Sequence, residues 1–262
     1  MSGAIVARAA VAPILGGPTL RAEQVSQLVL GETAAVLEVS GDWRRIRAVL
    51  DQYEGWVHAG YCVEMAAGAA AAWRRDADAW SRGAVVRAAD GRVRLPLRAR
   101  VALEGGGVRL PDGRCGPVVE GAVVPPADEV QAARATAPER WAWEQFAGTQ
   151  YQWGGITPLG VDCSGLVQTT FLARGIALPR DSTQQAACGA AVSPDGIRPG
   201  DLLFFRDALG PRITHVAFAG DGDTLVHSTV ACGGVVQESW LSGSRAAPLR
   251  ERLVAVRRLE DR

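Results

Sequence analysis

The pattern of apolar and polar residues changes near residue 126. Before that point, short runs alternate between the two classes, as in AAVLEV (34–39) and WRRIRAVL (43–50). Alternation with period two is typical of half-buried strands, and SGDW between these runs indicates a turn. EGWV (54–57) continues the group, and further short strands, separated by Gly, Pro and Asp-Gly turns, are predicted within 83–124. Short strands at this spacing favour small all-β barrels.

The two groups of strands are separated by EMAAGAAAAWRRD (64–76), and VVPPADEV (123–130) has the composition of a linker. We therefore predict three domains, with the bounds 1–66, 67–126 and 127–262. The first two are small all-β barrels, and the second is a divergent copy of the first.

The second half shows helical periodicity in residues 138–150, 163–175 and 180–189. Pro138 stands where helices begin, and Gly175 is a typical helix terminator. Four strands are predicted after these helices, within 200–207, 214–220, 224–230 and 253–259. Helices followed by antiparallel strands indicate an α+β domain in which the helices pack on the sheet.

Composition excludes several classes of protein. At 48% hydrophobic and 21% charged residues, the chain is typical of folded globular proteins. The 28 basic and 28 acidic residues cancel, which argues against a nucleic-acid partner. No apolar run of 18 residues predicts a membrane span, and the N-terminus lacks the pattern of a signal peptide, so we expect a cytoplasmic protein without a membrane partner. The oligomeric state is not indicated.

The cysteines give neither a disulfide framework nor a structural zinc site, because their number is odd and none forms a C-x-x-C pair. They are Cys62, Cys115, Cys163, Cys188 and Cys232. Cys163 differs from the others because it lies where the loop GGITPLGVD meets a predicted helix. The helix N-terminus would stabilise a thiolate and lower its pKa, and the backbone N–H of Cys163 could help to hold an oxyanion. A buried cysteine that only packs is the alternative, and it is the more common case for an isolated DCSG.

Two histidines in this half provide a candidate base. A hairpin centred on Asp221 would set His215 and His227 directly opposite each other on one face of the sheet. His215 could then be the base and His227 could hold its ring, as in a catalytic triad. A structural pair, or a metal site shared with the thiolate, are alternatives. The metal is disfavoured because no carboxylate at fixed spacing completes the ligand set, so we expect no metal and no cofactor.

Six motifs occur in order between residues 151 and 228: YQWGG, DCSGLV, LPRDSTQQ, RPGDLLFF, THVAFAG and LVHS. In this order they resemble the NlpC-type papain-like cysteine peptidases of bacterial cell-wall metabolism, over roughly the last half of the chain. The resemblance implies that Cys163 is the nucleophile, His215 the base and His227 the third polar residue. Asp162 and Ser164 flank the nucleophile and are candidates to contact substrate. Tyr151 and Trp153 are candidates to line the cleft, although buried aromatics more often belong to a core.

The first half resembles bacterial SH3-type domains in SQLVLGE, SGDW and YEGWV. Two such domains before this catalytic domain resemble the γ-D-glutamyl-L-diamino-acid endopeptidases of murein recycling. These enzymes cut murein tripeptides or tetrapeptides that carry a free N-terminal L-Ala. The resemblance implies that an acidic residue and a tyrosine of the first SH3-type domain hold the substrate amine together with an Asp-Ser pair. The counterparts here are Glu23 and Tyr53, with Glu32 or Tyr61 as alternatives, and Asp181 and Ser182.

Three other functions remain open at this point. The chain could be a general cell-wall hydrolase whose SH3-type domains bind murein, or a muropeptide-binding module without activity. An acyltransferase or amidase on the same fold is also possible, because a fold does not fix a function. The sequence does not distinguish L-Lys from diaminopimelate as the diamino acid.

Overall fold

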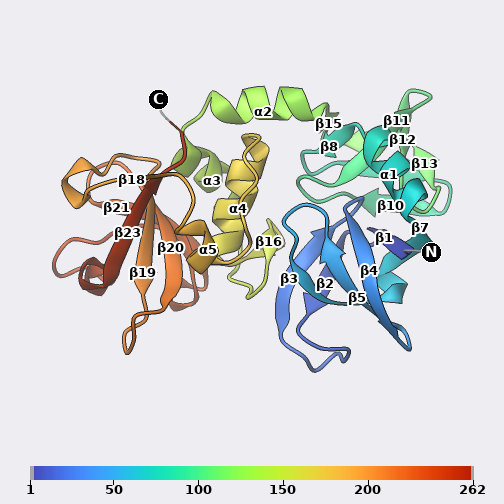
Figure 1. The fold of residues 1–262 in the computed structure, drawn as a ribbon. Helices are drawn as coiled ribbons and strands as arrows, with labels where there is room; N and C mark the ends of the chain where they lie inside the picture. The colour runs from blue at the N-terminus through green and yellow to red at the C-terminus, as the bar shows by residue number, and fades with distance from the viewer. Residues whose placement is uncertain (1–2, 261–262) are drawn as a thin grey trace. The chain divides into compact units, whose positions relative to one another are not determined.

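The computed structural model describes residues 3–260, and its contacts divide the chain into two compact units (Figure 1). Unit 1 ends at Val130 and unit 2 begins at Gln131. Since only two units separate, the division into three domains stays a prediction. No helix within residues 3–260 has the length and apolar character needed to cross a membrane.

The first part of unit 1 is one antiparallel sheet of seven strands, in the order β3-β2-β6-β5-β4-β1-β7. The strands are β1 (Gly3–Ala7), β2 (Val11–Leu15), β3 (Gln24–Val29), β4 (Thr33–Ser40), β5 (Trp43–Ala48), β6 (Glu54–His58) and β7 (Cys62–Ala66). A single 3₁₀ turn, Ala59–Tyr61, joins the last two of them.

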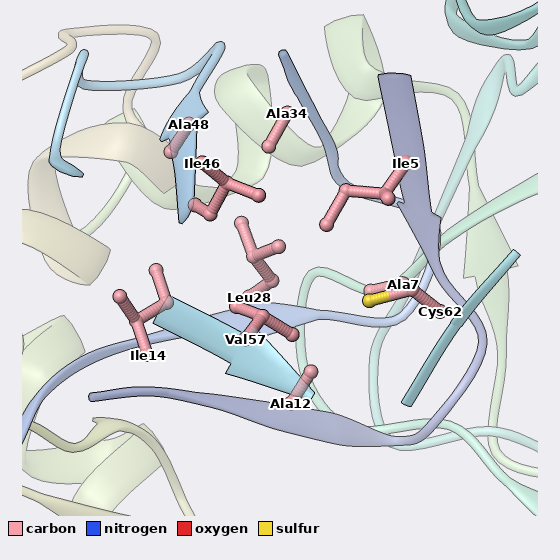
Figure 2. Close-up of a cluster of buried hydrophobic side chains, with 10 residues drawn as sticks. All are labelled: Ile5, Ala7, Ala12, Ile14, Leu28, Ala34, Ile46, Ala48, Val57 and Cys62. Carbon is pink, nitrogen blue, oxygen red and sulfur yellow. The ribbon is translucent and has the colours of Figure 1, made fainter. Parts of the chain in front are cut away.

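The alternation seen in the sequence explains the core of this sheet. On β5, Ile46 and Ala48 are buried, while Arg45 and Arg47, which alternate with them, point outward and pair with Glu54. Successive strand residues face opposite sides, so the alternating pattern places one set of side chains inside. Figure 2 shows these apolar side chains converging from several strands. The cluster consists of Ile5, Ala7, Ala12, Ile14, Leu28, Ala34, Ile46, Ala48, Val57 and Cys62.

The rest of unit 1 has a helix, α1 (Ala67–Asp76), and two small sheets. One sheet has the order β10-β9-β14 and the other β13-β12-β11-β8-β15. Their strands are β8 (Ala79–Ser81), β9 (Val85–Ala88), β10 (Gly91–Arg94), β11 (Arg100–Glu104), β12 (Gly107–Arg109), β13 (Cys115–Gly116), β14 (Val118–Glu120) and β15 (Val123–Val124).

Helix α1 was not predicted, although it contains a run of alanines. Alanine has the highest intrinsic helix propensity of all residue types. It buries Ala70 and Trp73 against Val6 and Ala102, and the Trp73 indole donates to the Gly31 carbonyl at 2.8 Å. The segment that we read only as a break between two strand groups is therefore a structural helix.

Unit 2 has an antiparallel sheet of six strands, in the order β18-β23-β19-β20-β21-β22, with helices packed against it (Figure 1). Its helices are α2 (Pro126–Arg134), which begins in unit 1, α3 (Pro138–Phe146), α4 (Cys163–Ala173) and α5 (Ser182–Gln185). Its strands are β18 (Ala190–Ala191), β19 (Leu202–Arg206), β20 (Ile213–Ala219), β21 (Thr224–Thr229), β22 (Gly234–Ser239) and β23 (Leu253–Arg258), and a separate hairpin is formed by β16 (Ile156–Thr157) and β17 (Gly160–Val161).

The predicted fold class is confirmed: a strand-rich N-terminal half precedes an α+β domain. Helices α3 and α4 and strands β19, β21 and β23 lie within the predicted segments, and β20 begins one residue before its segment, at Ile213. The predicted linker at 123–130 lies where the two units divide, but it is not irregular, because it contains β15 and the first half of α2. Pro126 at the start and Asp128 and Glu129 in the first turn are typical of a helix N-terminus, so the sequence does contain a signal for this helix.

Candidate active site

Cys163 is the first residue of α4, and Asp162 caps the helix. One carboxylate oxygen of Asp162 (Oδ1) accepts a hydrogen bond from the Gly165 N–H at 2.7 Å, and its backbone carbonyl accepts from Leu166 at 3.0 Å. An Asp in this position satisfies a backbone donor that the helix itself leaves unpaired. All residues of α4 are buried, so the helix holds the Cys163 backbone firmly inside unit 2.

The glycine of the DCSG motif has a steric role. A Cβ atom on Gly165 would lie 2.0 Å from the Gly155 carbonyl oxygen, which is far inside van der Waals contact. The Asp162 N–H in turn donates to that same carbonyl at 3.2 Å. The first turn of α4 can therefore lie directly on the loop before β16 only because residue 165 has no side chain.

A buried arginine supports this turn, and the sequence analysis missed it. Nη2 of Arg180 donates to Oδ2 of Asp162 at 2.5 Å, and Nη1 donates to the Ser164 hydroxyl at 2.8 Å. The Gly154 N–H donates to the same Asp162 oxygen at 2.8 Å. Arg180 is only 2% exposed, and buried charges require such partners. In LPRDST the sequence analysis names Asp181 and Ser182 as site candidates, but not Arg180. The one sequence feature that could have indicated a buried arginine is the acidic residue before the cysteine, Asp162, which needs a cationic partner.

Asp162 and Ser164 thus have internal partners for their side chains. The Ser164 carbonyl also accepts from the Gln185 amide at 3.0 Å, which ties α5 to the start of α4. These bonds position Cys163. A direct contact of Asp162 or Ser164 with substrate stays a prediction.

Tyr151 lies beside the cysteine. Its N–H donates to the Gly233 carbonyl at 2.8 Å, and it forms a parallel bridge with Val161, two residues before Cys163. Burial raises the pKa of the Tyr151 phenol, and negative charge on Cys163 and Asp162 acts in the same direction. The phenol therefore keeps its proton at neutral pH and can act as a hydrogen-bond donor near the thiol.

The two histidines meet, but the predicted register of their hairpin is wrong. In the structure Phe218 pairs with Val226 and Ala219 with Leu225, so the hairpin is centred on Gly222, which has a positive φ of 62°. His227 is therefore a diagonal neighbour of His215 and not its direct partner. A displacement of two residues keeps both side chains on one face, because side chains alternate with period two.

On this face the two rings form a hydrogen bond. Nε2 of His215 lies 2.7 Å from Nδ1 of His227, with ring centroids 4.9 Å apart. The other ring nitrogen of His227 lies 2.7 Å from Oε1 of Glu238 on β22. Phe205, directly opposite His215 on β19, stacks on the His215 ring at 5.9 Å. His215 is thus held both by a hydrogen bond and by an aromatic ring.

Glu238 was missed by the sequence analysis. Its segment, GVVQES, begins with glycine and two valines and has no clear alternation, so we predicted no strand there. The carboxylate also accepts from Nε of Arg245 at 2.9 Å and forms a second hydrogen bond with the Arg245 guanidinium.

The nucleophile and the base belong to elements in contact, since α4 packs against β20. The Cys163 thiol lies near the backbone N–H of Val216, the residue that follows His215, and this N–H favours the thiolate, as does the N–H of Ser164. Burial and the Asp162 charge outweigh them and raise the pKa of Cys163 to about 12. The prediction that the pKa of Cys163 is lowered is therefore wrong, because burial of the thiol dominates.

Burial also keeps the imidazoles neutral. It lowers the pKa of His215 to about 4, with a contribution from the positive charge of Arg245. The pKa of His227 falls to about 2, because of burial first and the charges of His215 and Arg245 second. The resting site at neutral pH therefore holds an uncharged thiol and two uncharged imidazoles.

The remaining predicted site residues lie in several places. Trp153 is 56% exposed, so it is not a core residue. Asp181 is exposed and precedes α5, and Ser182 is the first residue of that helix. Within residues 3–260, no group of three or more His, Cys, Asp or Glu side chains is arranged to hold a metal ion.

Glu23 and Tyr53 lie in unit 1. Glu23 is exposed in the loop before β3, and Tyr53 is half-buried just before β6. The alternative Glu32 is buried, forms an ion pair with Arg98 at 2.5 Å and accepts from the Val29 N–H. Its carboxylate is thus used inside unit 1, which favours Glu23 over Glu32 as a residue that contacts substrate. The other alternative, Tyr61, packs against the core of the seven-stranded sheet.

Comparison with known families supports the two resemblances, one in each half of the chain. Residues 148–258 match the NlpC/P60 family, and residues 14–60 match the family described as bacterial dipeptidyl-peptidase SH3 domain. A crystal structure of an NlpC/P60 family protein from Bacillus cereus superposes with a TM-score of 0.77, covering 98% of this chain and 99% of that one. At 18% identity this similarity establishes the fold.

Two curated relatives are similar to the catalytic half. One is a "Probable endopeptidase" of Haemophilus influenzae, 43% identical over 96 residues, which are 36% of this chain and 59% of the relative. Another is the "Gamma-D-glutamyl-L-lysine dipeptidyl-peptidase" of Bacillus subtilis, 43% identical over 84 residues, which are 32% of this chain and 28% of the relative. The chain thus spans less than two thirds of either relative. On the family matches, it carries an NlpC/P60 peptidase domain preceded by a bacterial SH3-type domain.

Proposed function

We propose that this chain is a cysteine endopeptidase that hydrolyses the bond between the γ-carboxyl group of D-Glu and a diamino acid in murein peptides. The observation that carries the proposal is the site in unit 2, where Cys163 begins α4 against β20 and His215 is hydrogen-bonded to His227 at 2.7 Å. The NlpC/P60 match, the SH3 family match and the name of the Bacillus subtilis relative support this choice of bond.

The chemistry begins with a proton transfer. His215 accepts the thiol proton as the Cys163 sulfur attacks the γ-carbonyl carbon, and the carbonyl electrons move to oxygen to give a tetrahedral oxyanion. The N–H of Cys163, at the helix N-terminus, and the Tyr151 hydroxyl are the donors we assign to that oxyanion. The carbon–nitrogen bond then breaks, and protonated His215 donates its proton to the leaving amine of the diamino acid.

A thioester between Cys163 and the γ-carboxyl group remains. His215, neutral again, removes a proton from water as the water oxygen attacks the thioester carbon. Collapse of this second intermediate breaks the carbon–sulfur bond, and the proton returns from His215 to the thiolate. L-Ala-D-Glu leaves as a dipeptide, and no metal or organic cofactor takes part in any of these steps.

The uncharged resting site fits this sequence of events. A thiol whose pKa is about 12 is almost fully protonated at pH 7, so a base must act at the moment of attack. Neutral His215 is in the protonation state that can accept the proton. Activity should therefore depend strongly on His215 as well as on Cys163.

We further propose that the substrate must carry a free L-Ala amine. The residues that the family resemblance implies for this amine are Asp181 and Ser182 of unit 2, with Glu23 and Tyr53 of unit 1. Removing an ammonium group from water is costly unless acidic groups or hydrogen-bond acceptors replace its hydration. Glu23 and Asp181 are exposed carboxylates, and Tyr53 and Ser182 are half-buried. Glu23→Gln should raise KM for the free peptide more than it lowers kcat.

The test is digestion of L-Ala-γ-D-Glu-diamino-acid peptide beside its N-acetylated form, with the products identified by mass spectrometry. We expect release of L-Ala-D-Glu from the free peptide only, and a loss of at least 10³-fold in Cys163→Ala. Release of the dipeptide by Cys163→Ala at the wild-type rate would rule out this mechanism. Cleavage of N-acetylated peptide or intact sacculi would instead favour a general cell-wall hydrolase.

A requirement for the free amine would suit recycling of small murein peptides in the cytoplasm, which we propose as the role of the chain. Fractionation of the native cells, with antibody detection of the chain, tests the location. Recovery from the envelope fraction would contradict it. Parallel assays with L-Lys and diaminopimelate peptides would identify the diamino acid.

A further inference from the structure

We propose that Glu238 is a positioning residue of the active site, which fixes the tautomers of both histidines so that His215 presents an unprotonated Nδ1 to the thiol. The inference rests on the proposed function, in which His215 is the base. It adds a carboxylate, and the arginine that holds it, to the Cys163, His215 and His227 set.

The three side chains lie on a diagonal across adjacent strands. His215 is on β20, His227 on β21 and Glu238 on β22, which is the edge strand of the sheet. His227 pairs with Val236, and Glu238 pairs with Leu225, so Glu238 is displaced by two residues from the position opposite His227. The same displacement relates His227 to His215, and all three side chains therefore share one face.

The rules for hydrogen-bond donors and acceptors allow one arrangement of protons on His215, His227 and Glu238. An ionised carboxylate only accepts, so the His227 nitrogen that lies 2.7 Å from Oε1 of Glu238, Nε2, must carry the proton. In a neutral imidazole the other nitrogen then accepts, so Nδ1 of His227 takes a hydrogen bond from Nε2–H of His215 at 2.7 Å. Nδ1 of His215 is left with its lone pair, as a base requires.

Burial makes this control effective. The side chain of His227 is 1% exposed and that of Glu238 is 17% exposed, so water competes little for these bonds. Arg245 donates from Nε to Oε2 of Glu238 at 2.9 Å and also bonds Oε1, which fixes the carboxylate in one orientation. The charged groups that act on the two rings are Glu238 on β22, Arg245 after that strand, and Asp162 just before α4.

A neutral amide would lose this control. In Glu238→Gln the side chain keeps its size, but its NH2 group must face either Arg245 or His227, both of which already supply donors. His227 can then adopt the other tautomer, with the proton on Nδ1, and His215 would in turn carry its proton on Nδ1. That tautomer cannot accept the thiol proton.

The tautomers can be read directly by ¹H–¹⁵N correlation NMR of the histidine side chains, because the chain has only three histidines. In the wild-type protein at pH 7.5 we expect Nε2–H for both His215 and His227. In Glu238→Gln we expect a mixture with Nδ1–H. A wild-type spectrum with His227 protonated on Nδ1 would overturn the proposal without recourse to any variant.

Kinetics on the free murein peptide give the second readout. Glu238→Gln should lower kcat by about 10- to 100-fold, the range typical of residues that orient a reacting group through another, and leave KM within about twofold. Glu251→Gln, which changes an exposed carboxylate in the same unit, is the matched control and should keep wild-type kcat. A folded Glu238→Gln protein with unchanged kcat and unchanged tautomers would contradict the proposal. If instead wild type and Cys163→Ala act alike on the peptide, the proposed function fails while the NMR result on Glu238 still stands.

Discussion

At the scale of single residues, Asp162 connects the fold to the chemistry. Its carboxylate caps α4 at Gly165, accepts from the Gly154 N–H and pairs with buried Arg180. Each of these contacts fixes the backbone immediately before Cys163. A residue that in the sequence looked like a neighbour of the nucleophile is therefore the main structural support of the nucleophile.

Replacing Arg180 by Met should destabilise unit 2 by about 3–5 kcal/mol, because it leaves the buried carboxylate of Asp162 without its charged partner. Urea unfolding followed by tryptophan fluorescence measures the change. Arg212→Met, at an exposed arginine, is the control and should shift stability by less than about 0.5 kcal/mol. Equal stability of the two variants would show that the buried pair contributes little.

The residue scale also shows what the sequence could predict of the site. Cys163, His215 and His227 were identified because each stands in a distinctive motif, and the structure places the two histidines in contact. Arg180 and Glu238 were not, because arginine and glutamate are common on surfaces and nothing local marks these two as buried. Their partners lie 18 and 11 residues away along the chain, and only the fold brings them together.

At the scale of elements, the meander β20–β21–β22 carries the row of polar side chains. Two of its strands were predicted from their apolar runs, but the edge strand β22 and the register were not. Register depends on how the turn is built, and the AGDGDT segment allows more than one centre. The prediction that the two histidines share one face of the sheet is confirmed, because the error in register was two residues. An error of one residue would have placed the histidines on opposite faces.

This meander should make the protein sensitive to acid. Burial lowers the pKa of His215 to about 4, below the value near 6.5 expected in the unfolded chain. Between those values the unfolded chain binds a proton that the folded chain does not, so stability must fall as pH falls from 6.5 toward 4. The loss for His215 is about 3 kcal/mol by pH 4.

Urea unfolding at pH 7.5, 6 and 5 tests this dependence, with the double variant His215→Gln, His227→Gln as control. Ionised carboxylates elsewhere also contribute to acid sensitivity, and the variant retains that part. Stability should therefore decline less steeply with acid in the variant than in the wild type. Parallel curves for the two proteins would mean that the histidines titrate alike in both states.

At the scale of the whole molecule, each unit has its own core. The cluster around Leu28 and Ile46 contains only residues of unit 1, and the cluster around Phe205 and Trp240 contains only residues of unit 2. The sequence predicted this separation, because the pattern of apolar and polar residues changes near residue 126. It did not show that the connecting segment contains the helix α2, because the prolines at 125 and 126 favoured an irregular segment.

A fragment of residues 126–262 should therefore fold alone, with α2 complete. We expect α+β circular dichroism and cooperative unfolding, and some fraying at the start of α2, because Glu129 would lose its ion pair with Arg82. The full chain under the same conditions is the reference. An aggregated or unfolded fragment would show that unit 2 depends on unit 1 for its stability.

The arrangement of the active site along the chain also bears on the order in which it assembles. The base, its partner and their carboxylate lie on three consecutive strands joined by short connections, and such local pairings form quickly. The nucleophile comes from a helix far upstream, and its approach to β20 is a long-range contact with a slower closure. In a newly made chain, His215, His227 and Glu238 can therefore be hydrogen-bonded to one another before Cys163 lies beside His215. Peptide cleavage would begin only when α4 docks on β20, because that contact brings the thiol to its base.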